Sequence, residues 1–274
     1  MVALRDHRVQ PLPKRARDTR LNVGALRSGT SYGYGRQNET DRDGACVIRI
    51  ASYNIRKAVG LDWRRDPDRI ADVLAEIDAD MVVLQEADKR TGPREGVLPL
   101  ERLEREQGYV LADVSARPLS HGWHGNAILM RAGFSVQETS RIDIPSLEPR
   151  GAVAVRIGAP DLEVVGVHLG LTRAIRRKQM TALQTYLNGC DHPVIIAGDF
   201  NEWNGDKMAF DDAAQVISPG PSFHAARPVT ALDRFVLAGA LRPVTAHVHR
   251  SDLARRASDH LPIVMEVDLP GGLP

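Results

Sequence analysis

Hydrophobic and polar positions near the start of the patterned region predict two strands separated by a helix. Residues 47–56 alternate and are rich in β-branched side chains, which is typical of a strand. Asp66 followed by Pro67 predicts a helix start, because aspartate caps helix N-termini and proline suits the first helical position. Residues 81–84 are continuously apolar and predict a buried strand. The core-facing stripe of the helix is formed by Ile70, Val73, Leu74 and Ile77.

The rest of the chain continues this alternation of strands and helices. Helices are predicted over residues 99–107 and from Thr172 to about Leu187. Further strands are expected over residues 109–114, 125–130, 150–156, 162–168, 194–197, 232–237 and 263–267. No period of 20–50 residues repeats, which disfavours solenoids and propellers. The periodicity therefore supports an α/β or α+β domain over residues 46–270.

Residues 1–45 show no sustained hydrophobic period and are rich in Arg, Gly, Ser, Thr and Asn. Such a segment cannot bury enough apolar surface to offset the entropy lost on ordering, so we expect a flexible basic tail. It carries nine Lys and Arg against five Asp and Glu, which leaves 27 against 30 for the rest of the chain. A basic arm that touches nucleic acid is the alternative, although the interspersed acidic residues and the lack of an aromatic ladder favour the first interpretation.

Composition limits the function classes. The chain has 274 residues, of which 43% are hydrophobic and 26% charged, as expected for a soluble globular protein with a sizeable core. The body after residue 45 lacks the surplus of cations with which a general nucleic-acid binder replaces counterions, so a broad DNA footprint is disfavoured. No apolar run approaches the ~20 residues that span a bilayer, so we expect no stable membrane insertion. Cys46 and Cys190 give no disulfide framework, and we expect a cytoplasmic monomer.

Polar residues stand where several predicted strands end. Asn54 lies near the end of one predicted strand, Glu86 follows another and His168 ends a third, and Asp199 and Asn201 follow a fourth after a glycine at which the backbone can turn. Side chains at these points are available to a ligand rather than to the core. An ordinary turn is the alternative for Asp199, because Gly, Asp and Asn are common turn residues. A lone strand-end histidine is likewise more often a partly buried residue with its hydrogen bonds satisfied.

Seven short motifs occur in order along residues 46–267. They are Tyr53-Asn54, Leu84-Gln85-Glu86, Gly125-Asn126-Ala127, Val167-His168-Leu169, Gly198-Asp199-Phe200-Asn201, Leu232-Asp233-Arg234 and Ser258-Asp259-His260. Together they resemble the endonuclease/exonuclease/phosphatase superfamily, the metal-dependent phosphoesterases that include deoxyribonuclease-like enzymes. The resemblance implies a four-layer α/β sandwich, in which two mixed central β-sheets are flanked by helices and the active site lies at one edge of both sheets.

Oxygen-bearing side chains among these motifs suit a magnesium or manganese site. Hydrolysis of a phosphoester requires a divalent ion, a positioned water and a partner for the leaving oxygen. Hard oxygen ligands suit Mg²⁺ or Mn²⁺, and Mg²⁺ commonly binds through only one or two protein carboxylates. Glu86 is the first-choice ligand, Asn54 is expected to position the ion or the phosphate, and Asp259 to ligate directly or through water. With two distant cysteines and no paired histidine spacing, a zinc site is disfavoured.

Five further residues match the catalytic positions of the superfamily. By resemblance, Asp199 orients or deprotonates the attacking water, and Asn201 donates an amide hydrogen to the phosphoryl oxygens. His260 contacts the scissile phosphate, while Asp233 forms a hydrogen bond with its other ring nitrogen. His168 assists the leaving group or the phosphate. The sequence leaves open whether Asp199 or His260 is the general base.

Three residues are candidates for binding the phosphate or the rest of the substrate, namely Asn126, Arg56 and Arg173. A structural turn is the alternative for Asn126. Arg173 belongs to a cluster of four cations near the start of the third predicted helix, for which a solvated polar face is the alternative. The tyrosine that abasic-site nucleases of this superfamily place near the phosphate has no clear counterpart, because residues 121–124 hold histidine and tryptophan instead.

We therefore expect a Mg²⁺- or Mn²⁺-dependent phosphoesterase that hydrolyses a phosphodiester by metal-assisted attack of an activated water. The substrate stays open between nucleic acid and a small or lipid-derived phosphodiester, because fold does not fix substrate. The alternatives are a phosphomonoesterase of the same superfamily and a non-catalytic nucleic-acid- or phosphate-binding relative. The non-catalytic alternative predicts the loss of at least one metal-binding or water-handling residue, and none is lost.

Overall fold

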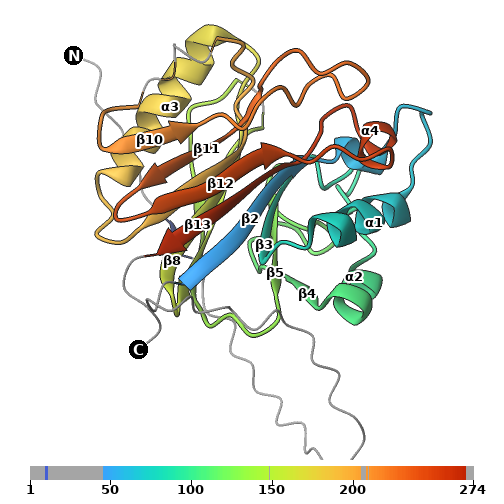
Figure 1. The fold of residues 1–274 in the computed structure, drawn as a ribbon, viewed down its shortest axis with the longest axis horizontal. Helices are drawn as coiled ribbons and strands as arrows, with labels where there is room; N and C mark the ends of the chain where they lie inside the picture. Colours follow the sequence, from blue (N-terminus) through green and yellow to red (C-terminus); the bar gives the residue numbers. More distant parts are fainter. Residues whose placement is uncertain (1–9, 12–45, 148, 205–207, 209, 270–274) are drawn as a thin grey trace, which may run out of the picture.

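Two β-sheets pack face to face at the centre of the molecule, and helices cover the outer face of each (Figure 1). The computed structural model describes residues 10–11, 46–147, 149–204, 208 and 210–269. The predicted four-layer sandwich with two mixed sheets is confirmed. The predicted tail over residues 1–45 lies outside the described residues except for Gln10 and Pro11, which pair with a strand of the first sheet. No helix in the described part of the chain is long and apolar enough to span a bilayer.

The first sheet has seven strands in the order β1-β6-β7-β8-β9-β11-β10. They are β1 (Gln10–Pro11), β6 (Val136–Ile142), β7 (Ala152–Gly158), β8 (Asp161–His168), β9 (Val194–Asp199), β10 (Ala214–Ile217) and β11 (Asp233–Ala238). Only β8 and β9 run parallel among the described neighbours. Helix α3 (Arg173–Leu187) connects these two strands, as expected for a parallel pair.

The second sheet has six strands in the order β12-β13-β2-β3-β5-β4. They are β2 (Cys46–Asn54), β3 (Met81–Gln85), β4 (Tyr109–Leu111), β5 (Ala127–Arg131), β12 (Arg242–Val248) and β13 (Ile263–Leu269). Here β2 and β3 form the parallel pair. The helical segments on this side are η1 (Arg56–Ala58), α1 (Pro67–Ile77), α2 (Leu100–Gln107) and α4 (Ala254–Ala257).

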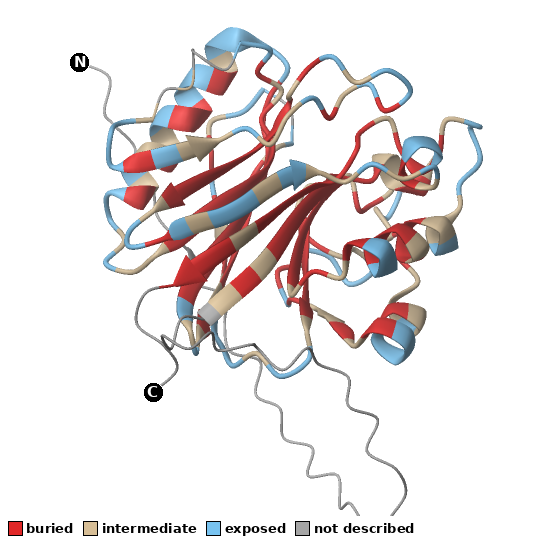
Figure 2. Ribbon diagram, in the orientation of Figure 1, coloured by how far each residue is buried: buried red, intermediate tan, exposed pale blue. Residues whose placement is uncertain are grey.

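Apolar side chains form three clusters that correspond to the three contacts between layers. The middle cluster lies between the sheets, where Ile50 of β2 and Val155 of β7 are both fully buried. A second cluster packs α1 against the six-stranded sheet, and a third packs α3 against the seven-stranded sheet through Met180, Leu183 and Leu187. Figure 2 shows the buried residues running along the central strands, whereas the edge strand β12 is largely exposed or half-buried.

Local signals identified the inner elements correctly. The Asp66 carboxylate accepts a hydrogen bond from the Arg69 backbone N–H at 3.0 Å, and Pro67 is the first helical residue, so the predicted cap of α1 is confirmed. Strands β6, β10 and β12 were not predicted, and β4 is shorter than the predicted 109–114. These strands are polar or short and lie at or near sheet edges, where one-sided burial leaves a weak hydrophobic pattern.

Arg176 differs from the solvated cluster in which the sequence placed it. Its guanidinium is buried and forms an ion pair with Glu202, with Nε and Nη2 3.1 Å and 3.0 Å from Oε2. It also donates to the Leu171 carbonyl at 2.6 Å. This pair ties the first turn of α3 to the loop after β9, the loop that carries Asn201.

Replacing Arg176 by alanine is expected to destabilise the fold, because it leaves the Glu202 carboxylate buried without its cation. Breaking a buried pair in this way costs about 3–5 kcal/mol. Urea unfolding followed by circular dichroism would measure the change. The matched control is Arg177→Ala one position along the helix, where the exposed side chain predicts a change within about 0.5 kcal/mol. Equal unfolding midpoints for the two variants would contradict the role of this pair.

Gly198 is required where β9 approaches β8. A Cβ at this position would lie 2.0 Å from the Val167 carbonyl oxygen, which belongs to the parallel neighbour and cannot move without breaking the ladder. Gly198→Ala is therefore expected to lower the free energy of unfolding by about 1–3 kcal/mol, the usual cost of overpacking. The control is Gly189→Ala, where a Cβ would make an ordinary 3.4 Å contact. Denaturant unfolding of both variants would test this, and an unchanged Gly198→Ala protein would contradict it.

Candidate active site

Two parallel strand pairs, one in each sheet, deliver the predicted polar residues to the same edge of the sandwich. In one sheet, Asn54 ends β2 beside Gln85 at the end of β3. In the other, His168 ends β8 beside Asp199 at the end of β9, and Asp233 begins the antiparallel β11 opposite Asp199. Because both sheets present these ends together, residues far apart in the sequence come within contact distance.

Asp199 is the centre of the resulting contacts and its side chain is buried. Its Oδ2 accepts a hydrogen bond from Asn54 Nδ2 at 3.2 Å, which joins the two sheets. The same oxygen lies 3.4 Å from His168 Nε2 and 3.7 Å from His260 Nε2. Its Oδ1 accepts from the Asn201 backbone N–H at 2.9 Å, so the carboxylate is held from four directions.

His260 is held between two carboxylates. Its Nδ1 lies 2.9 Å from Asp233 Oδ2, which also accepts from the Ser222 hydroxyl at 2.5 Å, while its Nε2 faces Asp199. Burial by itself lowers the pKa of His260, but the carboxylates of Asp233 and Asp199 outweigh it and raise that pKa to about 10. The imidazole is therefore protonated at neutral pH, so that Nδ1 donates to Asp233 while Nε2 lies 3.7 Å from Asp199.

His168 is neutral, unlike His260, although it contacts the same aspartate. Burial lowers the pKa of His168 to about 3, and the nearby Asp199 only partly opposes this. The ring is therefore neutral at physiological pH. One protonated and one neutral histidine thus face the same carboxylate, an arrangement that suits proton transfer at neutral pH.

Glu86 lies beside this group at the wall of a cavity of about 100 Å³. His168 lines the same cavity, so the two sheets share it. Glu86 forms an ion pair with Lys57. The cavity is strongly basic, because Lys89, Arg90, Arg94 and Arg150 also line it and Asp88 is its only further carboxylate among the described residues.

Asp259 and Arg56 lie on the other side of Asn54. Arg56 Nε is 3.5 Å from Asp259 Oδ2, and the Arg56 guanidinium lies over the Trp63 ring at 4.6 Å from its centroid. The Ser258 hydroxyl donates to the Asn54 backbone carbonyl at 2.7 Å, which fixes the loop that carries Asp259 and His260 to the end of β2.

Several residues near the active site have strained backbone angles. Left-handed backbone angles at residues other than glycine are uncommon and are concentrated at functional sites. At this edge of the sandwich they occur at Arg56 (φ 47°), Lys57 (φ 59°), Glu86 (φ 54°), His124 (φ 53°) and Asn201 (φ 52°).

Arg173 and Asn126, both predicted to bind the substrate, do not line the cavity. Arg173 is exposed on the first turn of α3 and does not line the cavity, so the structure does not bring it to the other site residues. Asn126 is fully buried, and its Nδ2 donates to the Gly151 carbonyl at 2.8 Å, as a structural residue would.

Asn201, a predicted catalytic residue, uses its amide within the protein. Its Nδ2 donates to the Leu169 carbonyl at 3.0 Å, which positions the loop after Asp199.

Sequence reasoning missed the basic wall of the cavity. Lys57 lies in the short segment η1, and Lys89, Arg94 and Arg150 lie in loops, where no hydrophobic period marks their direction. Only Lys57 had a local signal, since it follows Asn54 by three residues in a motif that ends a strand. Ser222, which donates to Asp233, likewise lies in a loop without a recognisable pattern.

The donor set fits a divalent cation. Asp199, Asp233 and His260 bring three ligand atoms within 4.8 Å of one another, close enough for one ion. Asp233 Oδ1 is buried and has no hydrogen-bond partner, so an oxygen of this group is available to a ligand. The predicted ligands Glu86, Asn54 and Asp259 add oxygen donors around the same edge, and oxygen-rich sets suit Mg²⁺ or Mn²⁺.

Comparison with known proteins identifies the family. The model of the Endonuclease/Exonuclease/phosphatase family matches residues 51–260, which include every predicted metal-binding and catalytic residue. The chain belongs to this family. The uncharacterized family relative YbhP of Escherichia coli (strain K12) is 29% identical over 251 residues, covering 81% of this chain and 96% of that protein.

Solved structures with low sequence identity to this chain have the same fold. An endonuclease/exonuclease/phosphatase from Beutenbergia cavernae DSM 12333 matches with a TM-score of 0.62 at 22% identity, covering 82% of this chain and 72% of that one. D. rerio TDP2, complexed with a single strand DNA product, matches with a TM-score of 0.63 at 18% identity, covering 81% of this chain and 99% of that one. At these identities the likeness supports the fold of the family rather than a particular substrate.

Proposed function

We propose that this protein is a divalent-metal-dependent phosphoesterase that hydrolyses a phosphodiester. The observation that carries the proposal is the buried Asp199 carboxylate, which Asn54, His168 and His260 hold beside a basic cavity. Membership in the family supports hydrolysis of a phosphoric ester. Residues from both sheets converge on the Asp199 carboxylate. The site therefore combines a general base, the protonated imidazole of His260 and a basic wall that can bind anions.

The chain's own residues divide the chemistry among them. Asp199 orients the attacking water and accepts its proton. His260, kept protonated by Asp233, donates to a phosphoryl oxygen as negative charge builds in the transition state. His168, neutral and at the cavity wall, contacts the leaving oxygen or the phosphate.

Glu86, Asn54 and Asp259 are the residues we expect to hold the metal. The two carboxylates that His260 faces are both buried and keep its imidazole protonated, so His260 suits a proton donor better than a ligand. When bound, a divalent ion supplies positive charge that neutralises the nonbridging phosphate oxygens. Lys57 and Arg56, which contact Glu86 and Asp259, would then be free to bind phosphate.

The basic cavity favours a substrate with anionic groups beyond the scissile phosphate. Its cations lie beside Glu86 and His168, where the next part of a phosphodiester chain would extend. The TDP2 structure of D. rerio holds a single strand DNA product, so a nucleic-acid end is one substrate of this kind. A small diester that carries a second phosphate is the other.

Arg94→Gln is expected to weaken binding of a doubly charged substrate. Loss of one charge-assisted contact of about 1.4 kcal/mol raises KM roughly tenfold. Steady-state kinetics on a short oligonucleotide with a 5′-phosphate would show this rise, while kcat and the kinetics of a neutral-tailed aryl diester stay close to those of the unmodified protein. Arg105→Gln on the exposed side of α2 is the control. Equal effects of Arg94→Gln on both substrates would contradict the role of the cavity.

A panel of substrates tests the proposed function itself. The full chain would be assayed with Mg²⁺, with Mn²⁺ and with chelator on an aryl phosphodiester, an aryl phosphomonoester, plasmid DNA, abasic duplex, single-stranded DNA and single-stranded RNA. We expect metal-dependent turnover of at least one diester. Turnover of the monoester alone would support the phosphomonoesterase instead, and no turnover with bound substrate would support a non-catalytic relative.

A further inference from the structure

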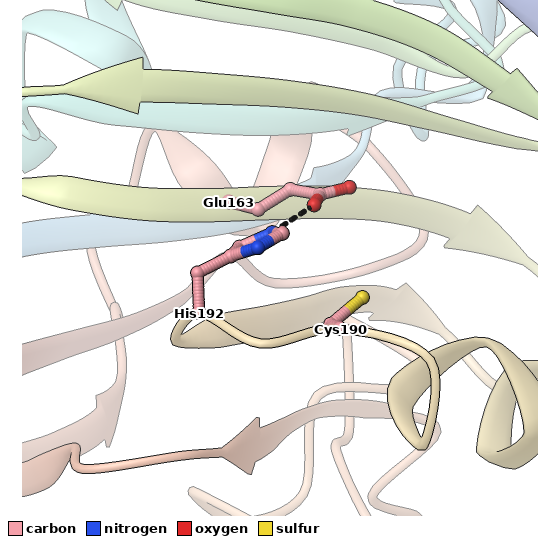
Figure 3. A group of neighbouring side chains, drawn as sticks. All are labelled: Glu163, Cys190 and His192. Carbon is pink, nitrogen blue, oxygen red and sulfur yellow. Dashed lines mark hydrogen bonds and ion pairs between the residues drawn. The ribbon is translucent and has the colours of Figure 1, made fainter.

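Glu163, Cys190 and His192 meet at the end of the first sheet opposite to the active site (Figure 3). Glu163 lies near the start of β8, and the other two residues lie in the loop between α3 and β9. His168 ends the same strand five residues later, which at ~3.3 Å per residue places the two groups about 16 Å apart. The cluster is therefore separate from the residues proposed to bind the substrate.

The three side chains offer a carboxylate, a thiol and an imidazole to one point. One ligand atom from each lies within 4.8 Å of the others, and His192 Nε2 is 2.6 Å from Glu163 Oε2. Bonds of about 2.0–2.3 Å from zinc to oxygen, nitrogen and sulfur place neighbouring ligand atoms roughly 3–4 Å apart, so modest side-chain adjustment would admit the ion. Figure 3 shows the His192 ring and the Glu163 carboxylate directed toward each other from different elements.

Neighbouring groups hold the ligands in this orientation. Asp191 Oδ1 lies 3.1 Å from His192 Nδ1, so that nitrogen can keep its proton while an ion placed between Nε2 and Glu163 Oε2 replaces the proton that these two atoms share at 2.6 Å. The Tyr186 hydroxyl donates to Glu163 Oε1, so the other carboxylate oxygen is directed at His192. The Cys190 thiol donates to the Tyr186 carbonyl at 3.4 Å. A histidine whose second nitrogen binds a carboxylate is the usual arrangement at metal sites.

A cavity of about 190 Å³ opens beside the three residues. This space is sufficient for a metal ion together with a water as fourth ligand. Glu138 adds a second carboxylate to its wall. Arg156 also lines the cavity, but both its Nε and Nη2 bind Asp161, at 2.9 Å and 3.0 Å, so its charge is already matched.

We propose that Glu163, Cys190 and His192 form a second metal site, which binds Zn²⁺ or a similar borderline-soft divalent ion. A thiolate and an imidazole favour such an ion over Mg²⁺, which prefers oxygen ligands throughout. The sequence disfavoured zinc because its two cysteines are far apart and its histidines show no paired spacing. Glu163 lies 27 residues before Cys190, and only the fold brings the two together. The ion would fix the loop between α3 and β9 to the start of β8. Cys190 would ligate as a thiolate, so binding of the ion releases the thiol proton to solvent.

Cobalt spectroscopy and zinc titration would test this site without relying on activity. The full chain would be stripped with chelator and titrated with Co²⁺ and, separately, with Zn²⁺, each in excess Mg²⁺ so that Mg²⁺ occupies the proposed active-site metal position. We expect one Co²⁺ per chain with a thiolate-to-cobalt charge-transfer band. Cys190→Ser should abolish that band, and His192→Gln should weaken Zn²⁺ affinity by at least roughly a hundredfold, more than the 10–100-fold typical of outer residues.

Two comparisons make the result decisive. Cys46→Ser removes the other cysteine and should leave the band unchanged, whereas Asp191→Asn should weaken Zn²⁺ binding by roughly tenfold through the orientation of His192. Urea unfolding of each stripped variant shows whether it remains folded, and Glu163→Gln provides a second ligand variant if Cys190→Ser does not fold. Absence of the band in the folded parent protein, or equal Zn²⁺ affinity in the parent and in the ligand variants, would overturn the proposal. Because activity is not measured, failure of the proposed phosphodiesterase would leave this result interpretable.

Discussion

Replacing Asp199 by asparagine is expected to lower the turnover of a phosphodiester roughly a thousandfold, within the range lost when a general base is removed. Asparagine has nearly the same shape and can still accept the hydrogen bond from Asn54, but it cannot take a proton from water. The loss should therefore appear in kcat, with little change in KM. Initial rates on an aryl phosphodiester at saturating Mg²⁺ would measure it.

Two controls separate this loss from damage to the fold. Asp211→Asn changes an exposed aspartate outside the site and should retain full turnover. The unfolding midpoint of Asp199→Asn should stay close to that of the parent protein, since the backbone turn at Gly198 is unchanged. A folded Asp199→Asn protein with near-normal kcat would mean that another group activates the water.

Replacing His260 by glutamine is expected to reduce kcat by roughly a hundred- to a thousandfold, as does removal of a donor that stabilises transition-state charge. Glutamine can donate a hydrogen bond but carries no positive charge. The pair of Asp233 and His260 explains why charge matters, because the 2.9 Å contact keeps the imidazole protonated in a buried site. Single-turnover kinetics would separate the chemical step from product release.

Asp233→Asn provides the companion variant. The expected loss is smaller than for His260→Gln, and the decline of activity with rising pH should begin at lower pH, because removing the carboxylate lowers the pKa of His260. His249→Gln, which changes a histidine paired with Glu76 away from the site, is the control and should leave the pH profile unchanged. Identical pH profiles for the parent and Asp233→Asn would contradict the charged form of His260.

The elements that the sequence predicted best are those whose signals are local. Helix α1 combines a capping aspartate, a proline at the first position and a complete apolar stripe, and the structure has all three. Strand β6 has the opposite character, because its first three residues are exposed, the apolar Val136 included, and only Ser140 and Ile142 are buried. Its place in the sheet depends on pairing with β7, which no local pattern reveals.

The same distinction explains the candidate site. Asp199, His168 and Asn54 were recognisable because each ends a strand, and strand ends meet at one edge once the sheets form. Whether a charged side chain then faces solvent or a partner depends on contacts between distant segments. Arg176 was expected on a solvated face but is buried against Glu202, a residue 26 positions later. Arg173, three residues before it, remains exposed and outside the cavity.

Hydrolysis of an aryl phosphodiester by the chelator-treated full chain, as Mg²⁺ or Mn²⁺ is added back, tests the central claim most directly. We expect a rate near the uncatalysed background without metal, a saturable rise as the ion is added, and a flat response from Asp199→Asn over the same range. An undiminished rate in chelator, or a rise of equal size in Asp199→Asn, would contradict the claim that the two sheets bring these residues together to cleave a phosphodiester with a divalent ion.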